Sequence, residues 1–233
     1  EFLSNFGSYL DIEKPSLLSN ISYFINFQLS KMYFRYFMWN FSGRQNDKQW
    51  KYDLENGNWI SGINLIDEYR LGPQKNLPSD VINNKARNQY YLIPFILGII
   101  GLIFIFRKNL KVFWPIFLLF IFTGIALKFY LNERVFEPRE RDYALVGSFY
   151  TYCIFIGFSF IAISEYLSKY LKNNFSFLLA IVITITSPLL LSFNNWDDHD
   201  RSNRYTAQTL AKAYLDSIDE DKQAMIFTIG DND

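Results

Sequence analysis

The residues best suited to chemistry in this sequence lie in one charged stretch, residues 132–142, which reads NERVFEPRERD. Seven of its eleven residues carry a charge, and both signs are present. An arginine guanidinium is a planar fork of donors that suits a phosphate or carboxylate, and nearby carboxylates can hold it in one orientation. The candidate anion-binding residues are therefore Arg139 and Arg141, supported by Glu137, Glu140 and Asp142. The alternative is a self-neutralised, solvated turn.

Pro138 predicts where the helix after this stretch begins. A proline prevents helix continuation behind it and biases Glu137 toward an extended backbone. Residues 139–142 would then form or border the first turn of the next helix. Free backbone N–H groups and the helix dipole favour an anion at that position.

Two further polar clusters are candidate supports for the same site. The first, after an aromatic segment, comprises Arg44, Asn46 and Asp47; the second, after the last apolar run, comprises Asp197, Asp198, His199, Asp200 and Arg201. For the first cluster, the alternative is a turn at the end of a helix. For the second, it is a polar network that anchors the exit of the last helix. The second cluster has metal-ligand residue types. Because consecutive residues cannot all face one ion, we predict neither a metal site nor a cofactor, and leave metal dependence open.

Four apolar segments must position the charged stretch: residues 90–106, 112–131, 143–163 and 175–193. A helix of about 20 residues extends roughly 30 Å, enough to cross a bilayer. A loop so rich in charge cannot lie in hydrocarbon, so we expect it at a membrane surface, with both tails on the same side. Lys128, near the end of the second segment, is expected to extend toward that surface. The distribution of Lys and Arg does not determine the orientation.

Residues 21–41 are rich in aromatic side chains but contain Gln28, Lys31 and Arg35, spaced three and four residues apart. This spacing places the three polar side chains on one helical face. Two cations near mid-bilayer would be costly, so we predict an amphipathic helix in the membrane interface. A core helix of a soluble lobe is the alternative. Residues 43–78 are rich in Gly, Asn and Pro, which predicts turns and loop.

The carboxyl-terminal part of the chain predicts the beginning of a further domain. Residues 204–217 have a helical apolar stripe, and residues 224–229 form an apolar run typical of a buried strand. We therefore expect a mainly α polytopic membrane protein in three parts. Residues 1–89 are expected to form an extramembrane or interfacial segment, residues 90–193 four transmembrane helices, and residues 194–233 the start of a truncated extramembrane α/β domain. The sequence begins without Met, and we expect a fragment of a longer protein.

Composition agrees with a membrane protein that has large polar loops. Half of the residues are hydrophobic and 19% aromatic, yet the mean hydropathy is only −0.01. Lys plus Arg and Asp plus Glu each number 23, so the formal net charge is zero. This balance argues against a nucleic-acid partner.

Five ordered segments together resemble a known family: WNFSGRQND (39–47), NGNWISGI (56–63), EPRERDYALVGSFY (137–150), NWDDHDRS (195–202) and GDND (230–233). They are similar to the transmembrane-protein-260-like family of predicted protein O-mannosyltransferases, which includes many bacterial envelope members. The resemblance implies a partial helical bundle of the GT-C glycosyltransferase architecture. It also implies a sugar donor linked to polyprenyl phosphate, with mannose as the sugar that the family name suggests. The implied acceptor is a protein or a glycan, with protein Ser/Thr as one candidate.

The same resemblance implies where the chain works. The charged stretch and both tails would face the extracytoplasmic side of a bacterial inner membrane, in contact with membrane lipid. The catalytic base would lie upstream of residue 1, so no catalytic residue is assigned within this sequence. A non-catalytic membrane transporter or a scaffold of an envelope complex is the alternative function. Charges in the middle of the apolar runs would favour transport, whereas charges gathered at one surface favour chemistry on a membrane-held substrate.

Overall fold

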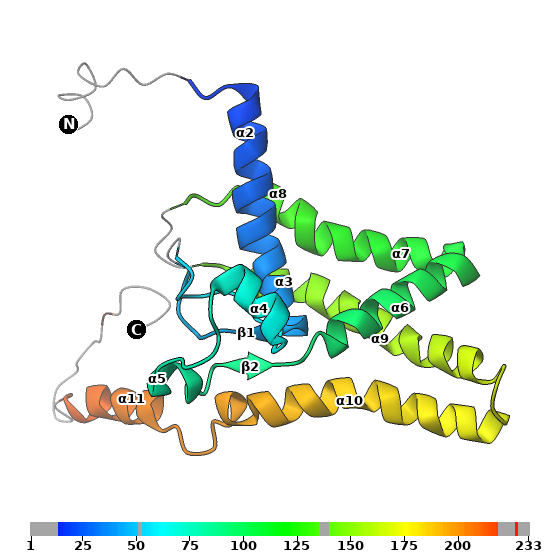
Figure 1. Cartoon of the computed structure of the whole chain (residues 1–233). Helices are drawn as coiled ribbons and strands as arrows, with labels where there is room; N and C mark the ends of the chain where they lie inside the picture. The colour runs from blue at the N-terminus through cyan, green and yellow to red at the C-terminus, as the bar shows by residue number, and fades with distance from the viewer. Residues whose placement is uncertain (1–13, 51–52, 136–139, 219–226, 228–233) are drawn as a thin grey trace. The chain divides into compact units, whose positions relative to one another are not determined.

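A computed structural model describes residues 14–50, 53–135, 140–218 and 227, apart from the side chain of Asp198 (Figure 1). The chain divides into two compact units, Glu1–Asn195 and Trp196–Asp233. The described residues are mainly helical, and their one regular sheet has two strands. The prediction of a mainly α protein is confirmed.

The first element described in this unit is a long helix made of three consecutive parts: α2 (Leu17–Tyr23), η2 (Phe24–Phe34) and α3 (Arg35–Phe41). Ser16 caps its start by accepting a hydrogen bond from the backbone N–H of Ser19 at 3.1 Å. The middle element, η2, is an 11-residue π-helix, whose hydrogen bonds span one residue more than those of an α-helix. The predicted helix over residues 21–41 is therefore present and starts earlier.

After this helix the chain forms a small sheet and two short helices. Strand β1 (Gly43–Arg44) pairs antiparallel with β2 (Asn88–Gln89), and α4 (Asn64–Leu71) and α5 (Ser79–Ile82) lie between them in sequence. Gly43 has a φ of 145°, and a Cβ there would overlap backbone oxygens of Asn88 and Ile60. The prediction of turns and loop over residues 43–78 missed α4 and the strand pairing.

Within the described residues, three helices are long and apolar enough to cross a membrane: Leu110–Leu131, Asp142–Leu167 and Asn173–Asp197. The first combines α7 (Leu110–Ile121), η3 (Phe122–Ala126) and α8 (Leu127–Leu131). The second combines η4 (Asp142–Leu145) with α9 (Val146–Leu167), and the third lies within α10 (Asn173–His199). By length and composition, these helices indicate a membrane protein.

The first of the four predicted spans differs from the other three. Where the sequence predicted a span over residues 90–106, the structure has α6 (Ile93–Lys108), a helix of 16 residues. At 1.5 Å per residue α6 extends about 24 Å, which is less than a typical hydrocarbon core of about 30 Å. Three of the four expected spans are thus helices of spanning length, and the other is a shorter helix.

Helix α6 packs closely against α9, and glycines make this approach possible. A Cβ at Gly98 would overlap the ring of Tyr152, and one at Gly101 would overlap the backbone carbonyl oxygen of Phe155. The Tyr152 hydroxyl also donates a hydrogen bond to the backbone oxygen of Phe95 at 2.7 Å. Because the contacts advance together along both helices, α6 and α9 run in the same direction.

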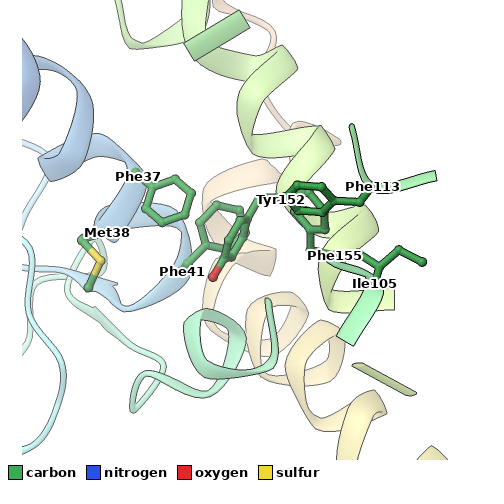
Figure 2. Close-up of a cluster of buried hydrophobic side chains, with 7 residues drawn as sticks. All are labelled: Phe37, Met38, Phe41, Ile105, Phe113, Tyr152 and Phe155. Atoms are coloured by element: carbon green, nitrogen blue, oxygen red, sulfur yellow. The ribbon is translucent and has the colours of Figure 1, made fainter. Parts of the chain in front are cut away.

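The aromatic helix joins the core of this bundle through α3. Phe37, Met38 and Phe41 form one buried cluster with Ile105, Phe113, Tyr152 and Phe155 (Figure 2). In Figure 1 the helix of residues 17–41 runs across the direction of α6, α7 and α9. It is not one of the three helices of spanning length. Its interfacial position stays a prediction.

The two ends of the bundle are distinct. Loop 132–142 joins the end of α8 to the start of η4 and α9, whereas the α6–α7 turn lies beside the other end of α9. At that second end, a salt bridge of 2.9 Å between Lys108 and Glu165 joins α6 to α9. Helix α10 returns to the first end, where the side-chain amide of Asn195 donates to the Tyr90 hydroxyl at 2.8 Å.

The second unit contains α11 (Thr206–Asp216), which matches the helix expected over residues 204–217. The strand predicted over residues 224–229 lies outside the described residues, apart from the single residue Phe227. The α/β domain therefore stays a prediction.

Candidate functional site

A buried ion pair joins the charged loop to the aromatic helix. Arg35, in α3, donates from Nη2 to Glu140 Oε1 at 2.8 Å, and the two side chains are only 3% and 10% exposed. The adjacent Tyr36 hydroxyl donates to the other oxygen of Glu140. Burial raises the pKa of Tyr36 far above its ordinary value, and the bond to Glu140 raises it further, so the phenol remains a protonated donor. Glu140 is thus held by α3 on both carboxylate oxygens.

The same arginine holds the loop that precedes α4. Its Nη1 donates to the backbone oxygen of Gly57 at 2.8 Å, and its Nε donates to the backbone oxygen of Lys31 at 2.9 Å. The guanidinium also lies over the ring of Trp39, with its central carbon 5.2 Å from the ring centroid. Arg35 therefore connects three chain segments far apart in sequence. Sequence analysis placed Arg35 on a polar helical face, but it did not identify a buried anchor.

Lys31 lies on the same face of the helix, one turn from Arg35. Its ammonium lies over the ring of Trp50 at 4.5 Å from the ring centroid, a cation–π contact. Burial, followed by the charges of Arg35 and Arg70, lowers the pKa of Lys31. The spacing of residues 28, 31 and 35 in the sequence predicted this polar face. In the structure, the loop after β1 and the charged loop pack against it.

A second buried ion pair holds the other end of the charged loop. Lys128 Nζ donates to Glu133 Oε2 at 2.7 Å, and the two side chains are 0% and 4% exposed. The amide of Gln28 donates to the backbone oxygen of Glu133 at 2.6 Å, and the Tyr23 hydroxyl donates to the same oxygen at 2.8 Å. Lys128 is thus fully buried and paired, contrary to the expectation that it extends to the surface.

Arg141 has a different environment from these anchored residues. It is exposed, and its side chain makes no ion pair or hydrogen bond within the described part of the chain. Arg141 directly precedes η4, so it stands at the start of the apolar helix Asp142–Leu167. Asp142 is also exposed, and its side chain accepts a hydrogen bond from the backbone N–H of Tyr143 at 2.9 Å. Glu140 is held by Arg35 and Tyr36, so its predicted role beside Arg141 is not what the structure shows.

The other predicted residues of this loop, Glu137 and Arg139, lie outside the described residues, as does Pro138. The expected helix start just after Pro138 is close to the observed one, because the helix begins at Asp142. Of the two candidate phosphate-binding arginines, the structure therefore describes Arg141 alone. Its side chain is exposed, so it is accessible to an anion.

Of the residues Arg44, Asn46 and Asp47, the first ends strand β1 and the other two lie in the loop that follows it. The side-chain oxygen of Asn46 accepts from the backbone N–H of Gly57 at 2.9 Å, and its amide donates to the backbone oxygen of Glu55, also at 2.9 Å. Arg44 donates from Nε to the backbone oxygen of Ala86 at 3.1 Å. Asp47 is exposed. These bonds brace the loop around Gly57, which Arg35 also contacts, and the supporting role of the three residues stays a prediction.

Asp67 is a buried carboxylate that sequence analysis did not single out. It lies in the first turn of α4, is 2% exposed, and accepts hydrogen bonds from the backbone N–H groups of Ser61 and Gly62, both at 2.8 Å. Carboxylates in this position stabilise the start of a helix. The sequence SGINLID contains the signal, since Ser61 and Asp67 flank the helix start.

The cluster after the last apolar run belongs largely to the second unit. Asp197, Asp198 and His199 end α10, followed by Asp200 and Arg201. The side chain of Asp200 accepts from the hydroxyl and the backbone N–H of Ser202, and these bonds lower its pKa. Asp200 thus stabilises a local turn, and the supporting role of this cluster stays a prediction. Within the described residues, no three His, Cys, Asp or Glu side chains are grouped as metal ligands.

Comparison with known proteins gives no match: no family model, no curated protein and no solved structure is similar to this chain. The resemblance carried by the five sequence segments therefore stays a prediction. In the geometry of the site, buried ion pairs anchor the loop through Glu133 and Glu140 and leave Arg141 exposed.

Proposed function

We propose that this chain is part of an integral-membrane glycosyltransferase of the GT-C type, which transfers a sugar, mannose by resemblance, from a polyprenyl-phosphate donor. The observation that carries the proposal is the position of Arg141, exposed and without a carboxylate partner among the described residues. It stands beside a helix start of spanning length, where backbone N–H groups also favour an anion. A phosphate carried by a membrane lipid would reach the protein at the end of such a helix.

The anchors of the loop support a binding role for Arg141. Arg35 holds Glu140, the residue directly before Arg141, and Lys128 holds Glu133 near the other end of the loop. Both ion pairs are largely buried, so their positions are restrained by packing. An arginine next to an anchored residue loses less conformational freedom when it binds a ligand. Arg139, two residues earlier, is proposed as the second phosphate-binding group.

The chemistry of such a transfer assigns a clear role to these cations. The acceptor hydroxyl forms a bond to the anomeric carbon of the sugar while the bond from that carbon to the donor phosphate oxygen breaks. The phosphate leaves with the electron pair, and a base takes the proton of the hydroxyl. Arg139 and Arg141 would stabilise the charge that develops on the leaving phosphate. The base is proposed to lie upstream of this sequence.

A hollow in the apolar part of the bundle provides a place for an isoprenoid chain. It has a volume of about 460 Å³, lies between α9 and α10, and is lined mainly by apolar side chains and Gly157. Pro188 lies on the α10 side of the hollow. A polyprenyl chain is a hydrocarbon and would be favoured in such surroundings. In this proposal the sugar transfer takes place on the extracytoplasmic face of a bacterial inner membrane, with a protein or glycan as acceptor.

The test is sugar transfer by the full-length protein from a polyprenyl-phosphate donor in proteoliposomes. Arg141→Lys and Arg139→Lys keep the charge and remove the planar fork. The matched control is Arg134→Lys, at an exposed arginine of the same loop. We expect each site variant to lower kcat/KM by about tenfold or more, since hydrogen bonds between charged groups contribute about 1.5–3 kcal/mol. If both site variants keep normal donor KM and turnover, the loop is structural and this assignment is wrong.

A further inference from the structure

A second hollow lies at the opposite end of the bundle from the charged loop, between α6 and α9. Its volume is about 460 Å³. Its lining has an apolar part, formed by Ile100, Ile103, Phe104 and Ala162, and a polar part, formed by Arg107, Lys108, Glu165, Tyr166 and Lys169. The two parts occupy successive turns of the same helical faces, since Ile103 and Arg107, or Ala162 and Tyr166, are one turn apart, and Lys169 lies in the turn just after α9. The hollow therefore passes from apolar to basic along the helix axes.

The polar part of this hollow keeps an excess of positive charge. Lys108 pairs with Glu165 at 2.9 Å, which neutralises one cation with the single acid. The side chains of Arg107 and Lys169 are exposed and have no ion pair within the part of the chain that the structure describes. Three cations and one carboxylate leave a net charge of +2 on the lining.

The surrounding turns extend the same charge. Residues 107–111 and 164–174 contain five cations, namely Arg107, Lys108, Lys111, Lys169 and Lys172, against one acid, Glu165. Both segments border helices of spanning length, so they lie where a helix leaves the hydrocarbon. The tyrosine at position 166 has an amphipathic ring of the kind that is enriched at lipid headgroup level.

We propose that this hollow binds an anionic phospholipid. The phosphate would lie between Arg107 and Lys169, and the first part of an acyl chain would lie along Ile103, Phe104 and Ala162. A soluble anion would gain nothing from the apolar part, and a zwitterionic lipid, which brings its own cation with its phosphate, would compensate the two unpaired cations less than an anionic lipid does. Basic pockets between transmembrane helices are a recurrent way of binding anionic lipid headgroups. The proposal is independent of the sugar-transfer reaction, which is placed at the other end of the bundle.

The test measures binding of phosphatidylglycerol to the full-length protein in nanodiscs of phosphatidylcholine, by titration with a fluorescent analogue. The site variant is Arg107→Gln with Lys169→Gln. The control is Lys111→Gln with Lys172→Gln, which removes two charges at the same end outside the hollow lining. Loss of the control charges reports the general attraction of the surface. We expect the site variant to lose at least tenfold more affinity than the control, because it also loses direct bonds to the phosphate.

Two further variants distinguish a lipid from a soluble anion. Ala162→Trp keeps every charge and fills the apolar part, so it should weaken phosphatidylglycerol binding by about tenfold or more. Exchanging the two cations, in Arg107→Lys with Lys169→Arg, should keep most of the binding. Millimolar inorganic phosphate should not displace the lipid. Equal losses in the site and control variants, unchanged binding in Ala162→Trp, or displacement by phosphate would each overturn the proposal.

Discussion

Replacing Arg35 by methionine tests whether the charged loop is anchored as the structure indicates. The variant leaves the Glu140 carboxylate, only 10% exposed, without its cation and removes the bond from Arg35 to the backbone oxygen of Gly57. Removing one partner of a buried ion pair costs about 3–5 kcal/mol, whereas exposed pairs contribute about 0–1 kcal/mol. With side chains 3% and 10% exposed, the higher range applies. We therefore expect Arg35→Met to lower the free energy of unfolding by about 3 kcal/mol or more.

The measurement is reversible denaturant unfolding of the full-length protein in mixed micelles, as a double-mutant cycle with Glu140→Gln. The double variant contains no unpaired buried charge, so it should recover part of the loss, with a coupling energy of about 1–3 kcal/mol. Arg134→Met is the control, because Arg134 is exposed in the same loop, and its effect should stay within about 0.5 kcal/mol. A loss below about 1 kcal/mol for Arg35→Met, or strictly additive single effects, would refute a buried anchor.

Three further predictions concern the bundle. Gly101→Ala would force a Cβ into the carbonyl oxygen of Phe155 and should lower the free energy of unfolding by about 1–3 kcal/mol. The control Gly157→Ala adds a Cβ in open space and should be nearly neutral. Denaturant unfolding of the two variants measures the difference. Lys128→Met leaves Glu133 buried and unpaired, and should cost about 3 kcal/mol or more in the same assay; a change under 1 kcal/mol would contradict the buried pair. In a cysteine-free background, an impermeant thiol reagent added to intact cells should label Val135→Cys and leave Asn109→Cys unlabelled; the reverse pattern would invert the proposed orientation.

Local patterns in the sequence determined the long helices and their approximate ends, but not the short helix α4. Runs of apolar residues about 20 long predicted the helices of α7–α8, α9 and α10, because backbone groups in hydrocarbon must bond within their own segment. The spacing of Gln28, Lys31 and Arg35 predicted a polar helical face, since side chains three and four residues apart share one side of a helix. The apolar stripe of residues 204–217 likewise predicted α11.

Tertiary structure alone decided which charges meet. Arg35 and Glu140 are 105 residues apart, and nothing in the charged stretch distinguishes Glu140 from Glu137 as the partner. Lys128 is buried because Glu133 folds back onto it, although its place near a helix end fits an exposed lysine equally well. The start of α6 at Ile93 is likewise a feature of the folded chain, since Tyr91 and Leu92, between β2 and the helix, have positive φ angles of 53° and 59°. Periodicity is a property of neighbouring residues, whereas ion-pair partners and burial depend on how distant segments pack.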